Sequence, residues 1–124
     1  MFQHIGITIH TQDDIETFYK GVLGLEEVRR FQVDPDLSER LFGIRRQVSV
    51  AVLSRDDFRV ELFLSDERQH GAYNHIGIAV PDPQAAMKRA ETQGFEVTRI
   101  ERESKSDLLF IRDHSGNAFE IKGS

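Results

Sequence analysis

One four-residue segment occurs twice in this chain of 124 residues, and the repeat limits what the chain can fold into. His4-Ile5-Gly6-Ile7 stands near the start, and His75-Ile76-Gly77-Ile78 stands past the middle. A glutamate within an apolar, strand-like run follows each copy, Glu61 after the first and Glu120 after the second. The repeat predicts two related modules that pack together, because a unit of this size cannot bury its own apolar face alone.

Both halves have the same predicted order of elements, which is strand, helix and three further strands. In the first half we expect strands at residues 4–9, 25–31, 48–53 and 58–64 and a helix at 13–19. In the second half we expect strands at 75–80, 95–101, 108–112 and 117–122 and a helix at 83–93. The predicted fold class is therefore α+β, with two βαβββ modules at residues 1–64 and 75–124, joined by a polar linker at 65–74 within one domain.

Local signals fix the ends of the predicted helices. Thr11 or Asp13 is expected to cap the first helix, and Asp82 followed by proline begins the second. Glycines 24 and 94 stand where these helices should end. Residues 32–46 have only a short counterpart in the second half, so we expect a flap there that contains a short helix at 37–42.

The His and Glu residues share one face of their strands, because side chains alternate along a strand. Isoleucines at positions 5, 7 and 9 form one face of the first strand, and His4, Gly6 and Thr8 form the other. The second copy repeats this pattern. Glu61 and Phe63 are opposite Val60 and Leu62, and Glu120 and Lys122 are opposite Phe119 and Ile121. All four His and Glu residues thus point away from the face that packs under a helix.

Two imidazoles and two carboxylates are a ligand set that a borderline divalent ion accepts, so His4, Glu61, His75 and Glu120 form a candidate metal site. Ordinary explanations exist for each residue. A lone His at a strand start is more often hydrogen-bonded or exposed, a lone Glu usually faces solvent, and duplication copies residues whatever their role. The glycine two residues after each His favours the site, because glycine weakens a strand unless space is needed.

Composition excludes several other classes of protein. The chain contains no cysteine, so disulfides and cysteine-ligated metal clusters are ruled out. Its net charge of −5 and scattered basic residues argue against nucleic-acid and anionic-membrane partners. No apolar run is long enough to span a bilayer, and the first residues do not have the form of a signal peptide. We expect a cytoplasmic protein that acts on a small molecule.

Five segments together resemble the vicinal oxygen chelate superfamily, which includes glyoxalase I, extradiol dioxygenases and bleomycin-resistance proteins. They are the two His-Ile-Gly-Ile copies, residues 18–24, residues 60–62 and residues 112–121. The resemblance implies eight strands that curl around a metal held by His4, Glu61, His75 and Glu120. It also implies a homodimer, and it leaves open whether each site lies within one chain or draws ligands from both.

For function, the resemblance implies a divalent ion (Zn, Ni, Co, Mn or Fe) that binds two adjacent oxygens of a small substrate. A lyase or isomerase reaction through an enediolate is then expected, with Glu120 or Glu61 as the base. Thr8, Phe63 and Lys122 are candidate pocket residues. Thr8 stands near the position where glyoxalase I proteins hold glutathione with an arginine, so a glutathione substrate is not favoured.

Two other functions fit the same resemblance. One is an Fe(II) dioxygenase, although Glu61 would then occupy a position that oxygen needs. The other is a small-molecule binding protein of the bleomycin-resistance type without catalysis, which would leave the complete ligand set unexplained. His10 and His114 could act as acid–base groups near the site. Both lie by loops or turns, so we expect their side chains to be solvated instead.

Overall fold

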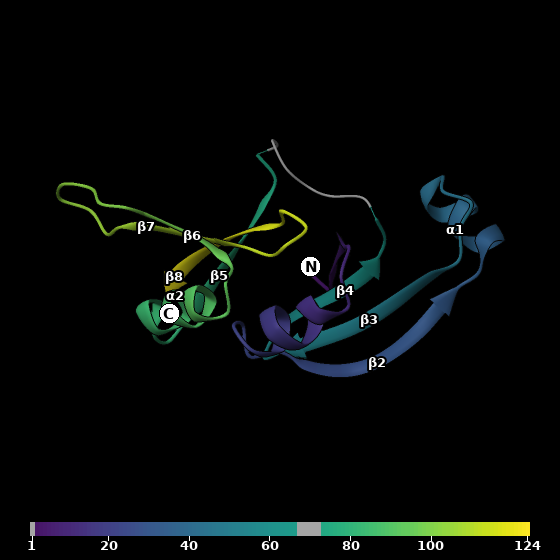
Figure 1. Cartoon of the computed structure of the whole chain (residues 1–124), viewed down its shortest axis with the longest axis horizontal. Coiled ribbons are helices and arrows are strands. Elements are labelled where there is room, and N and C mark those ends of the chain that lie inside the picture. Colours follow the sequence, from purple (N-terminus) through teal and green to yellow (C-terminus); the bar gives the residue numbers. More distant parts are fainter. Residues whose placement is uncertain (1, 67–72) are drawn as a thin grey trace.

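Each half of the chain forms one four-stranded sheet in the computed structural model, which describes residues 2–66 and 73–124 (Figure 1). The first half contains β1 (Ile5–Ile9), η1 (Ile15–Lys20), β2 (Glu26–Val33), α1 (Pro35–Phe42), β3 (Val48–Arg55) and β4 (Phe58–Leu64). The second half contains β5 (His75–Val80), α2 (Pro83–Thr92), β6 (Glu96–Ile100), β7 (Leu108–Arg112) and β8 (Ala118–Gly123).

The two sheets have the same topology. Their strand orders are β1-β4-β3-β2 and β5-β8-β7-β6. In each, the first strand of the half runs parallel to the last, and the other pairs are antiparallel. This equivalence confirms the predicted α+β class with two βαβββ modules. Most of the predicted linker lies at residues 67–72, outside the described residues.

The helices agree with the sequence in position and differ in detail. Asp82 caps α2 as expected, because its side chain accepts a hydrogen bond from the backbone N–H of Ala85 (3.0 Å). The short helix in the flap is present as α1, and it begins earlier than predicted because Asp34 caps it. The first helix begins at residue 13, and its last six residues form the π-helix η1. The hydroxyl of Thr11, one of the two expected cap residues, accepts a hydrogen bond from the backbone N–H of Asp13 (3.3 Å).

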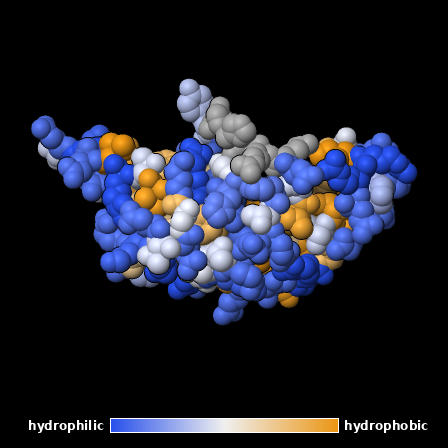
Figure 2. Space-filling model, viewed as in Figure 1, coloured by the Kyte–Doolittle hydropathy of each residue, from blue (hydrophilic) through white to orange (hydrophobic). Residues whose placement is uncertain are grey.

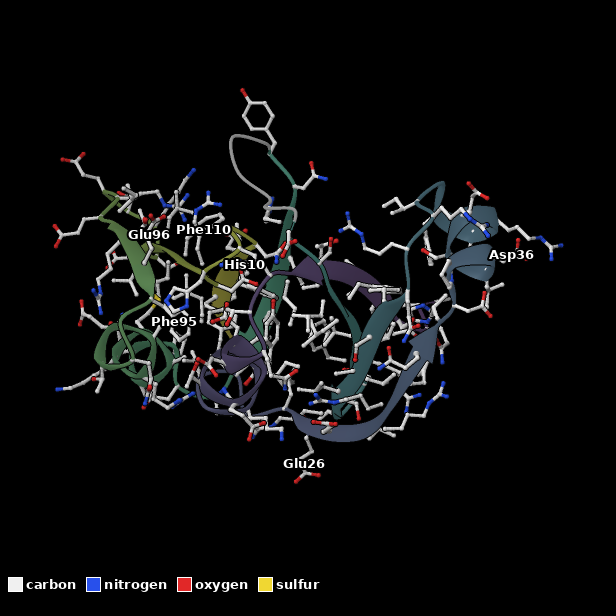
Figure 3. The ribbon with its side chains drawn as sticks, turned by 45° about the vertical axis from the view of Figure 1, so that its right-hand side comes forward. His10, Glu26, Asp36, Phe95, Glu96 and Phe110 are labelled. Carbon is white, nitrogen blue, oxygen red and sulfur yellow. The ribbon has the colours of Figure 1, made fainter. Side chains whose placement is uncertain are left out.

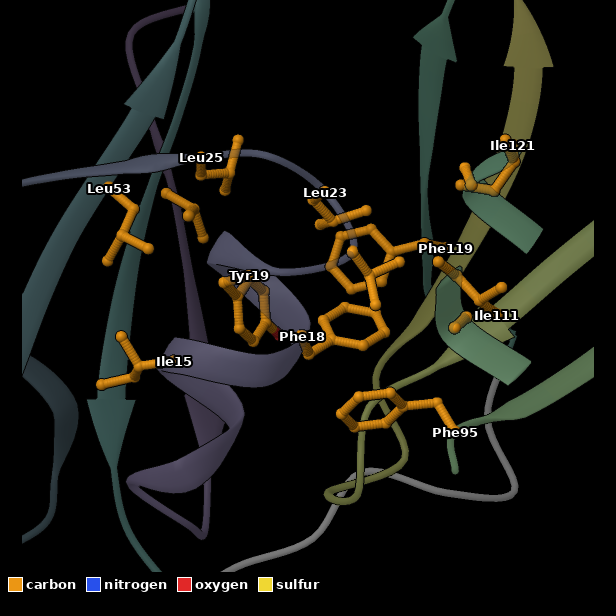
Figure 4. Packing of buried hydrophobic residues seen from close by; sticks show 14 of the residues in the cluster. Ile15, Phe18, Tyr19, Leu23, Leu25, Leu53, Phe95, Ile111, Phe119 and Ile121 are labelled. Atoms are coloured by element: carbon orange, nitrogen blue, oxygen red, sulfur yellow. The ribbon is translucent and has the colours of Figure 1, made fainter. Parts of the chain in front are cut away.

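A single apolar core joins the two halves (Figure 4). Phe18 of η1 lies at its centre, with ring centroids 4.8 Å from Phe95 and 5.4 Å from Phe119 of the second half. Arg89 of α2 reaches back to the first half and donates two hydrogen bonds to the carbonyl oxygen of Val22 (2.9 and 3.1 Å). The helix η1 therefore packs between the two sheets, and neither half buries its apolar face without the other.

A buried polar cluster lies beside this core and also links the halves. The Asp113 carboxylate accepts hydrogen bonds from the Tyr19 hydroxyl (2.8 Å), from the Ser115 backbone N–H (2.9 Å) and from both nitrogens of Asn117 (2.8 Å each). Burial raises the pKa of Asp113, and the Asn117 and Tyr19 donors oppose that rise. Burial, with the adjacent Asp113 charge, raises the pKa of Tyr19 well above its usual value. The Tyr19–Asp113 bond therefore ties η1 to the turn before β8.

Replacing Tyr19 with Phe should lower the free energy of unfolding by about 1.5–3 kcal/mol at neutral pH, because the buried carboxylate loses a hydroxyl donor. Losing that donor raises the pKa of Asp113 further. A carboxyl whose folded pKa exceeds its unfolded value of about 3.9 loses its stabilising contribution as pH rises. Urea titrations should therefore show a smaller loss near pH 4 than at neutral pH. An equal loss at both would contradict this account.

Candidate metal centre

His4 and Glu61 form a pair on the first sheet. Strand β1 begins directly after His4, and its Gly6 lies beside Glu61 of the parallel strand β4. The His4 Nε2 atom is 3.6 Å from the Glu61 Oε1 atom, and the side chains are 41% and 19% exposed. The Nδ1 atom of His4 contacts the side-chain oxygen of Gln3. A divalent ion could bond to both facing atoms, since metal–ligand bonds are about 2.1 Å long.

His75 and Glu120 repeat this pair on the second sheet. Gly77 of β5 lies beside Glu120 of β8, and His75 Nε2 is again 3.6 Å from Glu120 Oε1. The side chains are 44% and 16% exposed. His75 Nδ1 donates a hydrogen bond to the backbone carbonyl oxygen of Tyr73 (2.9 Å), and Nε2 is the ring nitrogen that faces the glutamate. An imidazole oriented in this way by a carbonyl is typical of a metal ligand.

The four predicted ligands form two separate pairs in the single chain. No group of three or more His, Cys, Asp or Glu side chains within residues 2–66 and 73–124 is arranged to hold a metal ion. The position of the shared core explains why the two pairs are separate. Val60 and Leu62 beside Glu61, and Phe119 and Ile121 beside Glu120, belong to the shared apolar cluster. Each His–Glu pair is therefore on the face of its sheet opposite the shared core.

The predicted pocket residue Thr8 lies where the two halves approach each other. A cavity of about 260 Å³ is lined by Gly6 and Thr8 of β1 and by His75, Arg112 and Asn117 of the second half. The Asn117 side chain donates a hydrogen bond to the Thr8 carbonyl oxygen (2.7 Å). The cavity thus adjoins the second His–Glu pair and is bordered by the strand that follows His4.

The other two predicted pocket residues each lie beside a pair. The Phe63 ring lies over Gly6, whose missing side chain leaves room for it. Lys122 Nζ is 3.3 Å from Glu120 Oε2. Both residues lie on the same strand face as the glutamate that precedes them.

Sequence reasoning missed a second pair of polar contacts between the halves. Asp14 is fully buried and accepts hydrogen bonds from the backbone N–H (2.9 Å) and the ring nitrogen (2.8 Å) of His114. The His114 ring also stacks on Phe95, and His10 Nδ1 is 2.6 Å from the Ser115 hydroxyl. The His114 side chain is 49% exposed, in agreement with the expectation that it is solvated, and both histidines also connect the two halves. A sequence read without a fold gives no sign that Asp14 and His114 meet.

The matching family model covers residues 1–121 and describes the Glyoxalase/Bleomycin resistance protein/Dioxygenase superfamily. The chain belongs to this superfamily. No helix in the described part of the chain is long and apolar enough to cross a bilayer. No curated protein matches the chain.

Solved structures of the same superfamily share the fold at low sequence identity. A glyoxalase family protein from Bacillus cereus is 20% identical, with 97% of this chain and 91% of that chain covered and a TM-score of 0.75. One from Enterococcus faecalis is 19% identical, with 98% and 95% covered and a TM-score of 0.71. The E126Q mutant of the fosfomycin resistance protein FosX from Listeria monocytogenes, in complex with Mn(II) and 1S,2S-dihydroxypropylphosphonic acid, is 15% identical. Its comparison covers 100% of this chain and 90% of that chain, with a TM-score of 0.75.

The two repeated glycines should respond differently to alanine. A Cβ at Gly6 would lie 3.2 Å from the Phe63 ring, whereas a Cβ at Gly77 would have no atom within 4 Å. Alanine in a strand is favoured over glycine by about 0.5–1 kcal/mol, so Gly77→Ala should raise the free energy of unfolding by that amount. Gly6→Ala should gain less or lose stability, because the ring must move. Parallel urea titrations check this, and equal gains would show that Phe63 does not rest on Gly6.

Proposed function

We propose that this protein is a metal-dependent lyase or isomerase of the glyoxalase type, which acts on a small substrate with two adjacent oxygens through an enediolate. The observation that carries the proposal is the equivalence of the two His–Glu pairs. Each pair has the same 3.6 Å separation, the same strand register and the same face. Duplication explains why the residues were copied, and a shared role would explain why their geometry has stayed matched while neighbouring positions have diverged.

The metal centre is proposed to form between two copies of the chain. One pair supplies only two ligands, and the core that joins the halves lies behind both pairs. The first-half pair of one chain would therefore meet the second-half pair of a partner. A two-fold symmetric homodimer contains two such sites, each with all four ligands.

The bound ion would polarise the two adjacent oxygens of the substrate and acidify the neighbouring C–H. Within this chain, His4 and His75 would hold the ion through their Nε2 atoms. Glu120 is proposed to take the proton and return it, because its second oxygen contacts Lys122 at 3.3 Å and is not directed at His75. Glu61 would then remain a ligand.

FosX gives independent support for a substrate with adjacent oxygens. The ligand in its complex, 1S,2S-dihydroxypropylphosphonic acid, has two neighbouring hydroxyl groups and was bound together with Mn(II). Zn, Ni, Co and Fe remain alternatives to Mn in this chain, because the ligand set accepts all of them.

Protein purified without an affinity tag should bind a stoichiometric amount of one of these five ions, measured by plasma mass spectrometry after dialysis. Glu61→Gln and His75→Ala should each empty nearly all sites, since every shared site needs both residues. Glu96→Gln is the matched control, because Glu96 lies on the same sheet as Glu120 and pairs with Arg112 (3.2 Å). A wild-type protein that binds none of the five ions would contradict the proposal.

Mixing two inactive chains tests whether the site is shared. One chain carries His4→Ala and Glu61→Gln, and the other carries His75→Ala and Glu120→Gln. A heterodimer of the two contains one complete site and one site without ligands, so it should recover about half of the wild-type metal content. Neither homodimer should bind. A heterodimer that also stays empty would show that each site lies within one chain.

A further inference from the structure

Phe63 and Lys122 occupy equivalent positions in the two halves. Each lies two residues after the glutamate of its pair, on the same strand face. Phe63 is beside Thr8 of β1, and Lys122 is beside Ala79 at the same place in β5. The two halves therefore place different chemistry, an aromatic ring and an ammonium group, at equivalent positions relative to the glutamate of each pair.

The first-half face around Glu61 is apolar on the side of Phe63, and Arg29 of β2 and Arg59 of β4 border this apolar part. The Phe63 ring would lie 3.2 Å from a Cβ at Gly6, and the Phe42 ring of α1 packs edge-on against it, with centroids 5.2 Å apart. Val50 and Val52 of β3 lie beside Phe63 and Glu61 and are fully buried, although they do not belong to the main core. This face therefore has its own apolar floor next to the His4–Glu61 pair.

Helix α1 extends that apolar surface into solvent. Leu41 is 61% exposed and Phe42 is 52% exposed. Figure 2 shows apolar surface at this end of the molecule, among charged residues, and α1 lies far from β6 of the second half (Figures 1 and 3). Exposed aromatic and aliphatic residues that cluster beside a candidate site indicate a surface that binds an apolar group.

The second-half face around Glu120 is charged. Lys122 is 63% exposed and lies 3.3 Å from Glu120 Oε2. Arg112, whose guanidinium pairs with Glu96 (3.2 Å), lines the cavity together with His75. An anion that binds to Lys122 would thus lie next to the carboxylate assigned to move the proton.

From these observations we propose that the substrate carries an apolar group on one side of its adjacent oxygens and an anionic group on the other. Phe63 and Phe42 of one chain bind the apolar group, and Lys122 of the partner subunit binds the anion. The anion is a carboxylate, phosphate or phosphonate, because each can accept a hydrogen bond from an ammonium group. This inference rests on the proposed function, and it adds the specificity of the same site.

Three hydroxamates test the inference, since each binds a metal through two adjacent oxygens and they differ only in the attached group. Acetohydroxamate carries neither group, hexanohydroxamate carries an apolar chain, and succinic monohydroxamate carries a carboxylate. Dissociation constants are measured by calorimetry on the metal-loaded dimer. Phe63→Ala should weaken hexanohydroxamate binding about tenfold, because the chain loses its apolar contact. Phe63→Leu should restore most of it.

Lys122→Gln should weaken succinic monohydroxamate binding about fivefold, the upper range for an exposed ion pair. It should leave hexanohydroxamate unchanged, and added salt should reduce the wild-type preference for the anionic probe. Lys88→Gln on α2 is the matched control for loss of an exposed charge.

The probe without a side group separates the possible failures. If acetohydroxamate binds and neither variant discriminates among the probes, the specificity inference is overturned while the proposed metal site stands. If the wild-type protein binds no metal and no acetohydroxamate, both are overturned. A variant that weakens all three probes equally also contradicts the inference, since the residue would then affect the metal site itself.

Discussion

The shared core between the two sheets is the constraint on which the rest of the structure depends. Each half contributes one face of its sheet, and η1 packs between them through Phe18 and Tyr19. Because side chains alternate along a strand, only one face of each sheet belongs to this core, and the opposite face lies outside it. The His–Glu pairs lie on those opposite faces. Burial in the core and placement of the candidate ligands are therefore two consequences of one alternating pattern.

Much of this arrangement could be predicted from the sequence, because it depends on local periodicity. The strands that contain Glu61 and His75 were predicted with their observed bounds, and the face of each ligand followed from parity alone. The contact between each His and its Glu could be expected too, once the fold placed β1 beside β4 and β5 beside β8. These features need only a strand of known length and a repeat of known register.

Features that depend on contacts between the halves could not be predicted. The pairing of Asp14 with His114 joins residues 100 positions apart, and nothing near either residue signals it. The Asp14 side chain, which stands directly before η1, makes no cap bond to that helix because the second half engages its carboxylate. The separation of the four candidate ligands into two pairs also depends on how the halves pack together. A repeat predicts equivalent residues, but it does not say which faces meet.

Duplication gives a symmetric scaffold, and a substrate is usually not symmetric. A site built from two equivalent halves binds an asymmetric molecule in one orientation only if the halves differ near the metal. In this chain the candidate ligands and the glycines beside them are repeated, whereas the residue two positions after each glutamate differs, Phe63 in one half and Lys122 in the other. The α1 insertion adds to the apolar side, where Phe42 packs on Phe63. The conserved geometry between the halves would thus hold the ion, and the differences between them would orient the substrate.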